Sequence, residues 1–126
     1  MNLRLLLKNS LLPLLLLLTL SACAHTETPQ SLAAKTLLTS RQAVIAGATT
    51  VDALCKQGVV KPIDCATAST LYKQSQSAYN VASDAFVLAI QTGASADWAQ
   101  YLTKEADYKA LAASAIAAYN QFGGGK

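Results

Sequence analysis

Apolar residues recur at helical spacing along most of the chain after residue 31. Between residues 31 and 57 they return at steps of three, four and seven, which places them on one face of a helix. The residues of that face are Leu37, Leu38, Val44, Ile45, Ala48, Val51, Leu54 and Cys55. We predict a first helix over 31–57, with Ser31 as its N-cap and Gly58 just beyond its end. Gly47 lowers the helix propensity and marks either a bend or a close contact with another helix.

Two further segments carry a heptad pattern, in which seam residues alternate at steps of three and four. In the segment 65–91 these are Cys65, Ala68, Tyr72, Ser75, Tyr79, Ala82, Phe86 and Ala89. In the segment 95–122 they are Trp98, Tyr101, Glu105, Tyr108, Ala112, Ala115, Tyr119 and Phe122. Pro62 suits the first turn of the second helix, and Ser95 is the predicted N-cap of the third.

The pattern predicts an all-α fold, an antiparallel up-down-up three-helix bundle over residues 31–122. Short connections make consecutive helices antiparallel, and in that arrangement large side chains face small ones. The expected pairs are Ala48 with Tyr72, Phe86 with Tyr101, Tyr79 with Tyr108, and Ala82 with Glu105. In the alternative arrangement, the third helix swings away and leaves a hairpin of two helices with a mobile arm.

The first 23 residues have the pattern of an export signal. Arg4 and Lys8 precede a run of leucine from 11 to 20, and small residues follow it. The run is too short for a good membrane-spanning helix, which needs about 20 apolar residues. Its end, Leu20-Ser21-Ala22-Cys23, resembles the lipobox of bacterial lipoproteins. An ordinary cleaved signal peptide is the alternative.

The resemblance to a lipobox implies a lipid anchor at Cys23. In that family the cysteine sulfur receives a diacylglycerol, the signal is removed, and the new amino terminus is acylated, for example with palmitate. More than one acyl chain gives stable membrane attachment. Ala24, rather than Asp, follows the cysteine, which implies the outer membrane; we expect its periplasm-facing side. The predicted parts are a signal helix (1–22), a lipidated tether (23–30), the helical domain (31–122) and a flexible tail (123–126).

The charge of the exported part does not favour nucleic-acid binding. The chain has ten basic and seven acidic side chains, but Arg4 and Lys8 belong to the signal. Eight basic residues therefore stand against seven acidic ones after cleavage, without a basic cluster. Proteins that bind nucleic acid concentrate positive charge on one face, so we expect no such partner.

Two cysteines remain after Cys23, and the compartment predicts that they are joined. The periplasm is oxidising, so the pair Cys55 and Cys65 indicates a disulfide that staples the first hairpin. A redox role lacks a Cys-x-x-Cys motif, and a zinc site lacks further His or Cys ligands nearby.

Residues for catalysis or metal binding do not form a recognisable set. The only histidine, His25, lies in the tether, where we expect it to be solvated. Asp84, Glu105 and Asp107 are the carboxylates nearest to one another, but a bare bundle offers no cleft to pair them as acid and nucleophile. Glu105 instead suits an i,i+4 surface pair with Lys109. We therefore expect no enzyme activity, no cofactor and no metal.

Aromatic residues form the one pattern with possible partner-binding content. Five of them, all at seam positions, are candidates: Tyr72, Tyr79, Trp98, Tyr101 and Tyr108. The simpler interpretation makes them core, with hydroxyls reaching water at the rim. The alternative leaves part of the stripe exposed to bind a partner helix or a second copy, since tyrosine and tryptophan are enriched in interfaces. Glu105 in the same stripe favours partial exposure, because an unpaired buried carboxylate is costly.

Two functions fit these observations. The first is a small non-enzymatic envelope lipoprotein that acts as a scaffold or accessory subunit through a helical surface. The second is a lipoprotein that inhibits or excludes an enzyme, a transporter or a phage component, by analogy of architecture. In both, the partners are a membrane, through Cys23, and a protein of the envelope.

Overall fold

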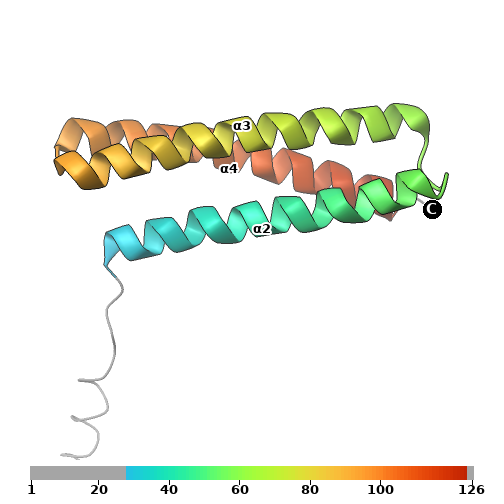
Figure 1. Ribbon diagram of the computed structural model, residues 1–126, viewed down its shortest axis with the longest axis horizontal. Helices are drawn as coiled ribbons and strands as arrows, with labels where there is room; N and C mark the ends of the chain where they lie inside the picture. The colour runs from blue at the N-terminus through green and yellow to red at the C-terminus, as the bar shows by residue number, and fades with distance from the viewer. Residues whose placement is uncertain (1–27, 125–126) are drawn as a thin grey trace, which may run out of the picture.

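The computed structural model describes residues 28–124, which fold into three α-helices (Figure 1). These helices are α2 (Pro29–Lys56), α3 (Pro62–Thr92) and α4 (Ser95–Gly123). They lie along one long axis, and two short turns reverse the chain between them (Figure 1). The predicted antiparallel up-down-up bundle is confirmed. Helix α4 packs on both other helices, so the alternative with a free third helix does not apply.

Helix α2 begins before its predicted start. Thr28, rather than Ser31, is the N-cap, and its hydroxyl accepts a hydrogen bond from the Ser31 N–H at 3.2 Å. Pro29 follows at the first helical position, where its fixed φ suits the helix and its missing N–H costs little. The prediction of Ser31 as the cap was wrong because it overlooked this Thr-Pro start. The tether residues before Thr28 lie outside the described part of the chain.

A glycine in the left-handed conformation closes the turn between α2 and α3. Gly58 has a φ of +73°. The Gly58 N–H donates to the Cys55 carbonyl, and the Val59 N–H donates to the Leu54 carbonyl, both at 3.0 Å. These two bonds are the Schellman arrangement, which satisfies the last carbonyls of a helix. Pro62 then opens α3, as predicted.

The turn between α3 and α4 also contains a left-handed glycine, Gly93, with a φ of +65°. Ser95 does not cap α4, in contrast to the prediction. It is the first helical residue, and Ala94 occupies the N-cap position without a side-chain hydrogen bond. Thr92 organises this turn instead, because its hydroxyl accepts from the Ala94 N–H and donates to the carboxylate of Asp97.

Helices α3 and α4 pack along each other more extensively than either packs on α2. The rings of Tyr79 and Tyr108 meet edge to face, with centroids 5.6 Å apart. The rings of Phe86 and Tyr101 lie 5.2 Å apart. Both expected pairs are confirmed, and the same seven-residue step separates them on each helix. The two helices therefore share one continuous register.

Helix α2 meets α3 in a second continuous register. Cys55 is bonded to Cys65, and the Arg41 guanidinium carbon lies 4.6 Å from the centroid of the Tyr79 ring. Fourteen residues separate the two contacts on each helix. Between them, Ala48 and Tyr72 line the same groove, in agreement with their expected pairing.

Apart from Val60 in the connection between α2 and α3, the buried apolar residues lie at predicted core or seam positions. The buried apolar residues are Leu37, Val44, Val51, Val60, Ala68, Ala82, Ala89, Tyr101, Tyr108, Ala112, Ala115 and Tyr119. Alanine dominates on α3 and tyrosine contributes on α4, so rings from one helix fill the space left by small side chains on the other.

Candidate partner-binding surface

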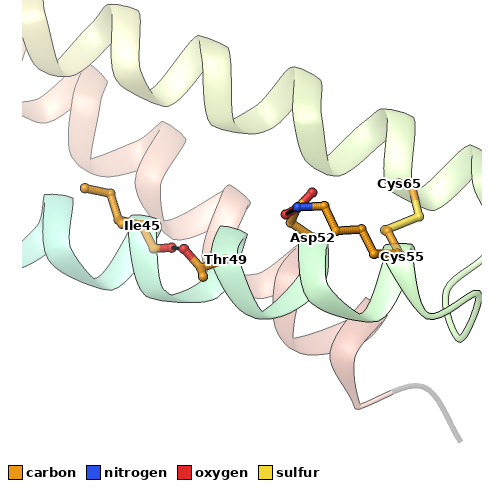
Figure 2. A network of polar contacts seen from close by, with 6 residues as sticks. Ile45, Thr49, Asp52, Cys55 and Cys65 are labelled. Carbon is orange, nitrogen blue, oxygen red and sulfur yellow. Dashed lines mark hydrogen bonds and ion pairs between the residues drawn. A yellow bond between two sulfur atoms is a disulfide. The ribbon is translucent and has the colours of Figure 1, made fainter.

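The predicted disulfide joins the end of α2 to the start of α3, at the end of the bundle remote from the start of α2 (Figure 1). Cys55 lies in the last turn of α2 and Cys65 in the first turn of α3, with Cα atoms 6.0 Å apart. Figure 2 shows the sulfur–sulfur bond spanning the two helices. Since both sulfurs are oxidised, neither residue is a free thiol, and the bond holds the two helix ends together.

A partly open groove of about 330 Å³ lies between α2 and α3 next to this disulfide. The small residues Ala48, Ala68 and Ser69 leave the space, and Ile45 and Tyr72 also line it. The lining is more apolar than polar. A groove of this kind suits an apolar side chain of a partner protein better than a polar ligand.

Two polar side chains of the α2 wall are already engaged within their own helix. The Thr49 hydroxyl donates to the Ile45 carbonyl at 2.8 Å. The Lys56 ammonium lies 2.6 Å from the Asp52 carboxylate. Figure 2 shows both contacts along α2 on the way to the disulfide. These groups therefore do not aim unpaired hydrogen-bonding atoms into the groove.

Tyr101 and Tyr108 are core residues rather than surface residues. Each is only 1% exposed. Their predicted partner-binding role is not available to them in this fold, because a partner would have to separate the helices to reach the rings. The alternative interpretation of these two residues as core is the one that the structure supports.

Tyr72, Tyr79 and Trp98 are only partly buried, so a partner has access to part of each. Tyr72 lines the groove. Tyr79 is covered on one side by the Arg41 guanidinium. Trp98 lies near the opposite end of the bundle and packs edge to face on Phe86, with centroids 6.1 Å apart. The five aromatic candidates therefore form no single site.

Glu105 is buried, which corrects the expectation that it signals an exposed seam. Only 8% of the residue is exposed. Its carboxylate lies 2.9 Å from the Lys109 ammonium, so the predicted pair is present, although one of its members is not on the surface. The ion pair offsets the cost of burying this carboxylate, and exposure is not needed to explain it.

Three buried hydroxyls have no hydrogen-bond partner among residues 28–124: those of Ser75, Tyr101 and Tyr108. Burial raises the pKa of Tyr101, and the negative charge of Glu105 raises it further. Burial also raises the pKa of Tyr108; Tyr79 adds to the rise and the positive charge of Arg41 opposes it. The tyrosines are therefore held firmly in their neutral form.

Within residues 28–124, no group of three or more His, Cys, Asp or Glu side chains is placed to hold a metal ion. His25 and the lipidation candidate Cys23 lie outside the described part. Asp84 is exposed, whereas Glu105 is buried and paired with Lys109.

Sequence reasoning missed three residues of α2 at this surface. Thr49 and Asp52 line the groove, and Arg41 covers Tyr79. Asp52 lies four residues from Ala48 and three from Cys55, Arg41 lies three residues from Val44, and Thr49 directly follows Ala48. A helical-wheel count from the α3-facing residues of α2 would have found them.

Searches against protein-family models, curated proteins and solved structures find no match to this chain. Across residues 28–124, no helix carries an apolar run sufficient to cross a bilayer. The function is therefore inferred from the residues of this chain alone.

Proposed function

We propose that this protein is a non-enzymatic bacterial envelope lipoprotein that acts as a scaffold or accessory subunit. Acyl chains on Cys23 anchor it in the outer membrane, facing the periplasm, and a helical surface binds an envelope protein. The tetrad Leu20-Ser21-Ala22-Cys23 supports the anchor. The disulfide between Cys55 and Cys65 supports an oxidising compartment.

The observation that carries the scaffold function is the groove between α2 and α3. The disulfide ties the two walls together at one end, so the groove exists before a partner arrives and little ordering is required on binding. Tyr72 contributes a partly exposed ring, and rings of this kind are typical anchors of protein interfaces. A partner helix that inserts one apolar side chain beside Tyr72 fits this geometry.

Photo-crosslinking in living cells tests this function. A photoreactive residue replaces Ser69, which is exposed and lines the groove. The matched control replaces Ser114, which is exposed on α4. We expect one discrete crosslinked envelope protein from position 69 and none from position 114. Identical patterns from the two positions, or no product from either, would contradict the proposal.

The second candidate function is inhibition or exclusion, and it is supported by exposed apolar residues at the disulfide end of the bundle. Val59 and Ile63 flank the disulfide-stapled turn and are 68% and 69% exposed. An exposed apolar tip on a stapled turn suits insertion into a cleft of another protein. In that case crosslinks arise from position 59 rather than 69, and the captured protein is a hydrolase, a transporter or a phage component.

A further inference from the structure

Exposed apolar side chains gather at the end of the bundle where the chain enters from Cys23. The start of α2, the end of α3 and the start of α4 all lie at this end (Figure 1). Five large apolar residues within about two helical turns of this end are between 43% and 59% exposed: Leu32, Val87, Leu88, Ile90 and Leu102. We refer to these five residues as the apolar collar.

The collar surrounds the end of the bundle rather than running along one side. Successive residues of a helix point 100° apart, so Val87, Leu88 and Ile90 spread over the outward half of α3. Leu32 lies outside the core face of α2 by the same count. A partner helix needs a stripe along one face. A ring at the tip instead suits a flat apolar medium into which the tip dips.

Few charged side chains lie at this end. Residues 85–96, which form the last turns of α3 and the following turn, contain none, and Asp97 follows them in the first turn of α4. Residues 29–40 contain one, Lys35. At the opposite end, residues 52–64 contain four, namely Asp52, Lys56, Lys61 and Asp64, and residues 111–124 of α4 contain none. Charged side chains are costly in an apolar phase, so the end next to Cys23 is better suited to contact lipid than the opposite end.

Trp98, the single tryptophan of the chain, lies at this same end. It is partly buried against Phe86 and Tyr101, with ring centroids 6.1 and 5.8 Å away, and part of it remains exposed. Tryptophan is enriched where a membrane meets water, because its ring is apolar at one side and polar at the other.

The length of the tether keeps this end near the bilayer. Helix α2 begins at Pro29, so five residues separate it from Cys23. Five extended residues span at most about 18 Å. With acyl chains on Cys23, the collar therefore cannot move far from the membrane surface. Leu32 and Cys55 are 23 residues apart on α2, which is about 35 Å along the helix, so the collar is far from the disulfide.

We infer that the collar docks on the bilayer that holds the acyl chains of Cys23. Its apolar side chains enter the layer between headgroups and acyl chains, as they do in interfacial helices. The bundle then stands end-on, and the disulfide, the groove and Val59 face away from the lipid. This inference rests on the lipid anchor proposed above and adds an orientation to it.

Fluorescence quenching of Trp98 tests this inference on the whole acylated protein. The protein is reconstituted into vesicles of phosphatidylethanolamine and phosphatidylglycerol that carry bromine near the top or near the centre of the acyl chains. We expect quenching of Trp98 by the shallow bromines, at least twofold stronger than by the deep ones. The control is the double variant Trp98→Phe/Val59→Trp, whose tryptophan at the far end should not be quenched.

The outcomes separate the possible failures. Equal quenching of the tryptophan at position 98 and of the tryptophan at position 59 would mean that the bundle lies flat on the membrane. Absence of quenching at Trp98 would mean that the collar faces water or a protein. Either result overturns the inference. If acylated protein remains bound to the vesicles in that experiment, the anchor itself stands. Protein that carries no acyl chain and leaves the vesicles would instead contradict the proposed function.

Substitutions in the collar provide a second readout. The exposed residues Leu32, Leu88 and Leu102 are changed together to Gln, and the matched control changes Val59 and Ile63 to Gln. We expect the collar variant to lose at least half of the Trp98 quenching while its midpoint temperature of thermal unfolding stays unchanged. The control variant should quench as the unmodified protein does. Equal quenching in all three proteins would overturn the inference.

Discussion

Gly47 on α2 lies directly against the ring of Tyr119 on α4. A Cβ atom added at Gly47 would fall 2.7 Å from a ring carbon of Tyr119. Of the two roles predicted for this glycine, the close contact between helices is therefore present. The Tyr119 hydroxyl continues across the bundle and donates a long hydrogen bond, 3.4 Å, to the Ala68 carbonyl on α3. One ring thus touches both other helices.

Replacement of Gly47 by Ala should destabilise the bundle despite the better helix propensity of alanine. The propensity gain is about 1 kcal/mol, and the steric clash costs about 1–3 kcal/mol, so we expect a net loss of up to about 2 kcal/mol in the free energy of unfolding. Urea denaturation measures it. In a Tyr119→Ala background the clash is absent, and Gly47→Ala should then be stabilising. The same loss in both backgrounds would contradict the contact.

Removal of the disulfide should weaken the fold without changing its architecture. The bond joins residues ten positions apart, and the chain-entropy relation gives about 2–3 kcal/mol for a loop of this size. The double variant Cys55→Ala/Cys65→Ala should lose that much stability in urea denaturation and keep its helical circular dichroism. Reduction of the unmodified protein is the matched comparison. Thiol labelling of unreduced exported protein at both positions would show that the bond does not form.

Replacement of Ser75 by Ala should stabilise the protein. The Ser75 side chain is 1% exposed, and its hydroxyl has no partner among the described residues. A buried hydroxyl without a hydrogen bond costs about 1–3 kcal/mol, and alanine also has the higher helix propensity. We expect a gain of about 1 kcal/mol in urea denaturation. Ser114→Ala on the exposed side of α4 reports the propensity contribution alone, and an equal gain there would contradict the role of burial.

Stability should fall as the pH rises through about 10, the ordinary pKa of tyrosine. Burial raises the pKa values of Tyr101, Tyr108 and Tyr119 in the folded protein. Above that pH the unfolded chain releases protons that the folded protein retains, so alkali favours unfolding; below it all three are neutral in both states and contribute nothing. Each tyrosine steepens the decline by up to about 1.4 kcal/mol per pH unit.

Urea midpoints between about pH 9 and pH 11 measure this decline. Tyr101→Phe removes one of the three tyrosine hydroxyls whose pKa is raised. The Tyr101 hydroxyl has no hydrogen-bond partner among the residues described here. This variant should show a shallower decline than the unmodified protein. Parallel profiles for the two proteins would contradict the assignment to Tyr101.

The sequence pattern predicted the register of the bundle because heptad positions define both which residues face inward and how antiparallel helices align. The contacts of Tyr79 with Tyr108 and of Phe86 with Tyr101 followed from that alone. Helix ends were harder to predict, because Thr28 and Ser31 are both acceptable caps and the choice depends on Pro29. The prediction that Ser95 is the N-cap of α4 was wrong for a similar reason. The Thr92 hydroxyl makes the hydrogen bonds of that turn, and Ala94 takes the N-cap position.

The heptad pattern did not predict how deeply Glu105 is buried or that Arg41 packs on the ring of Tyr79. The sequence predicted the pair of Glu105 with Lys109, but only the fold shows that Glu105 is buried within that pair. Arg41 lies at the edge of the core face of α2, where a cation is ordinarily assigned to solvent. Its place over the Tyr79 ring depends on how α2 and α3 are aligned by the disulfide.

Intact-mass spectrometry of the protein purified from membranes of its own host tests the central claim most directly. The account predicts a chain that begins at Cys23, carries acyl groups at that residue, and is lighter by two hydrogens because Cys55 and Cys65 are joined. A chain that still begins with Met1 and carries no lipid would contradict the anchor, the compartment and both proposed functions.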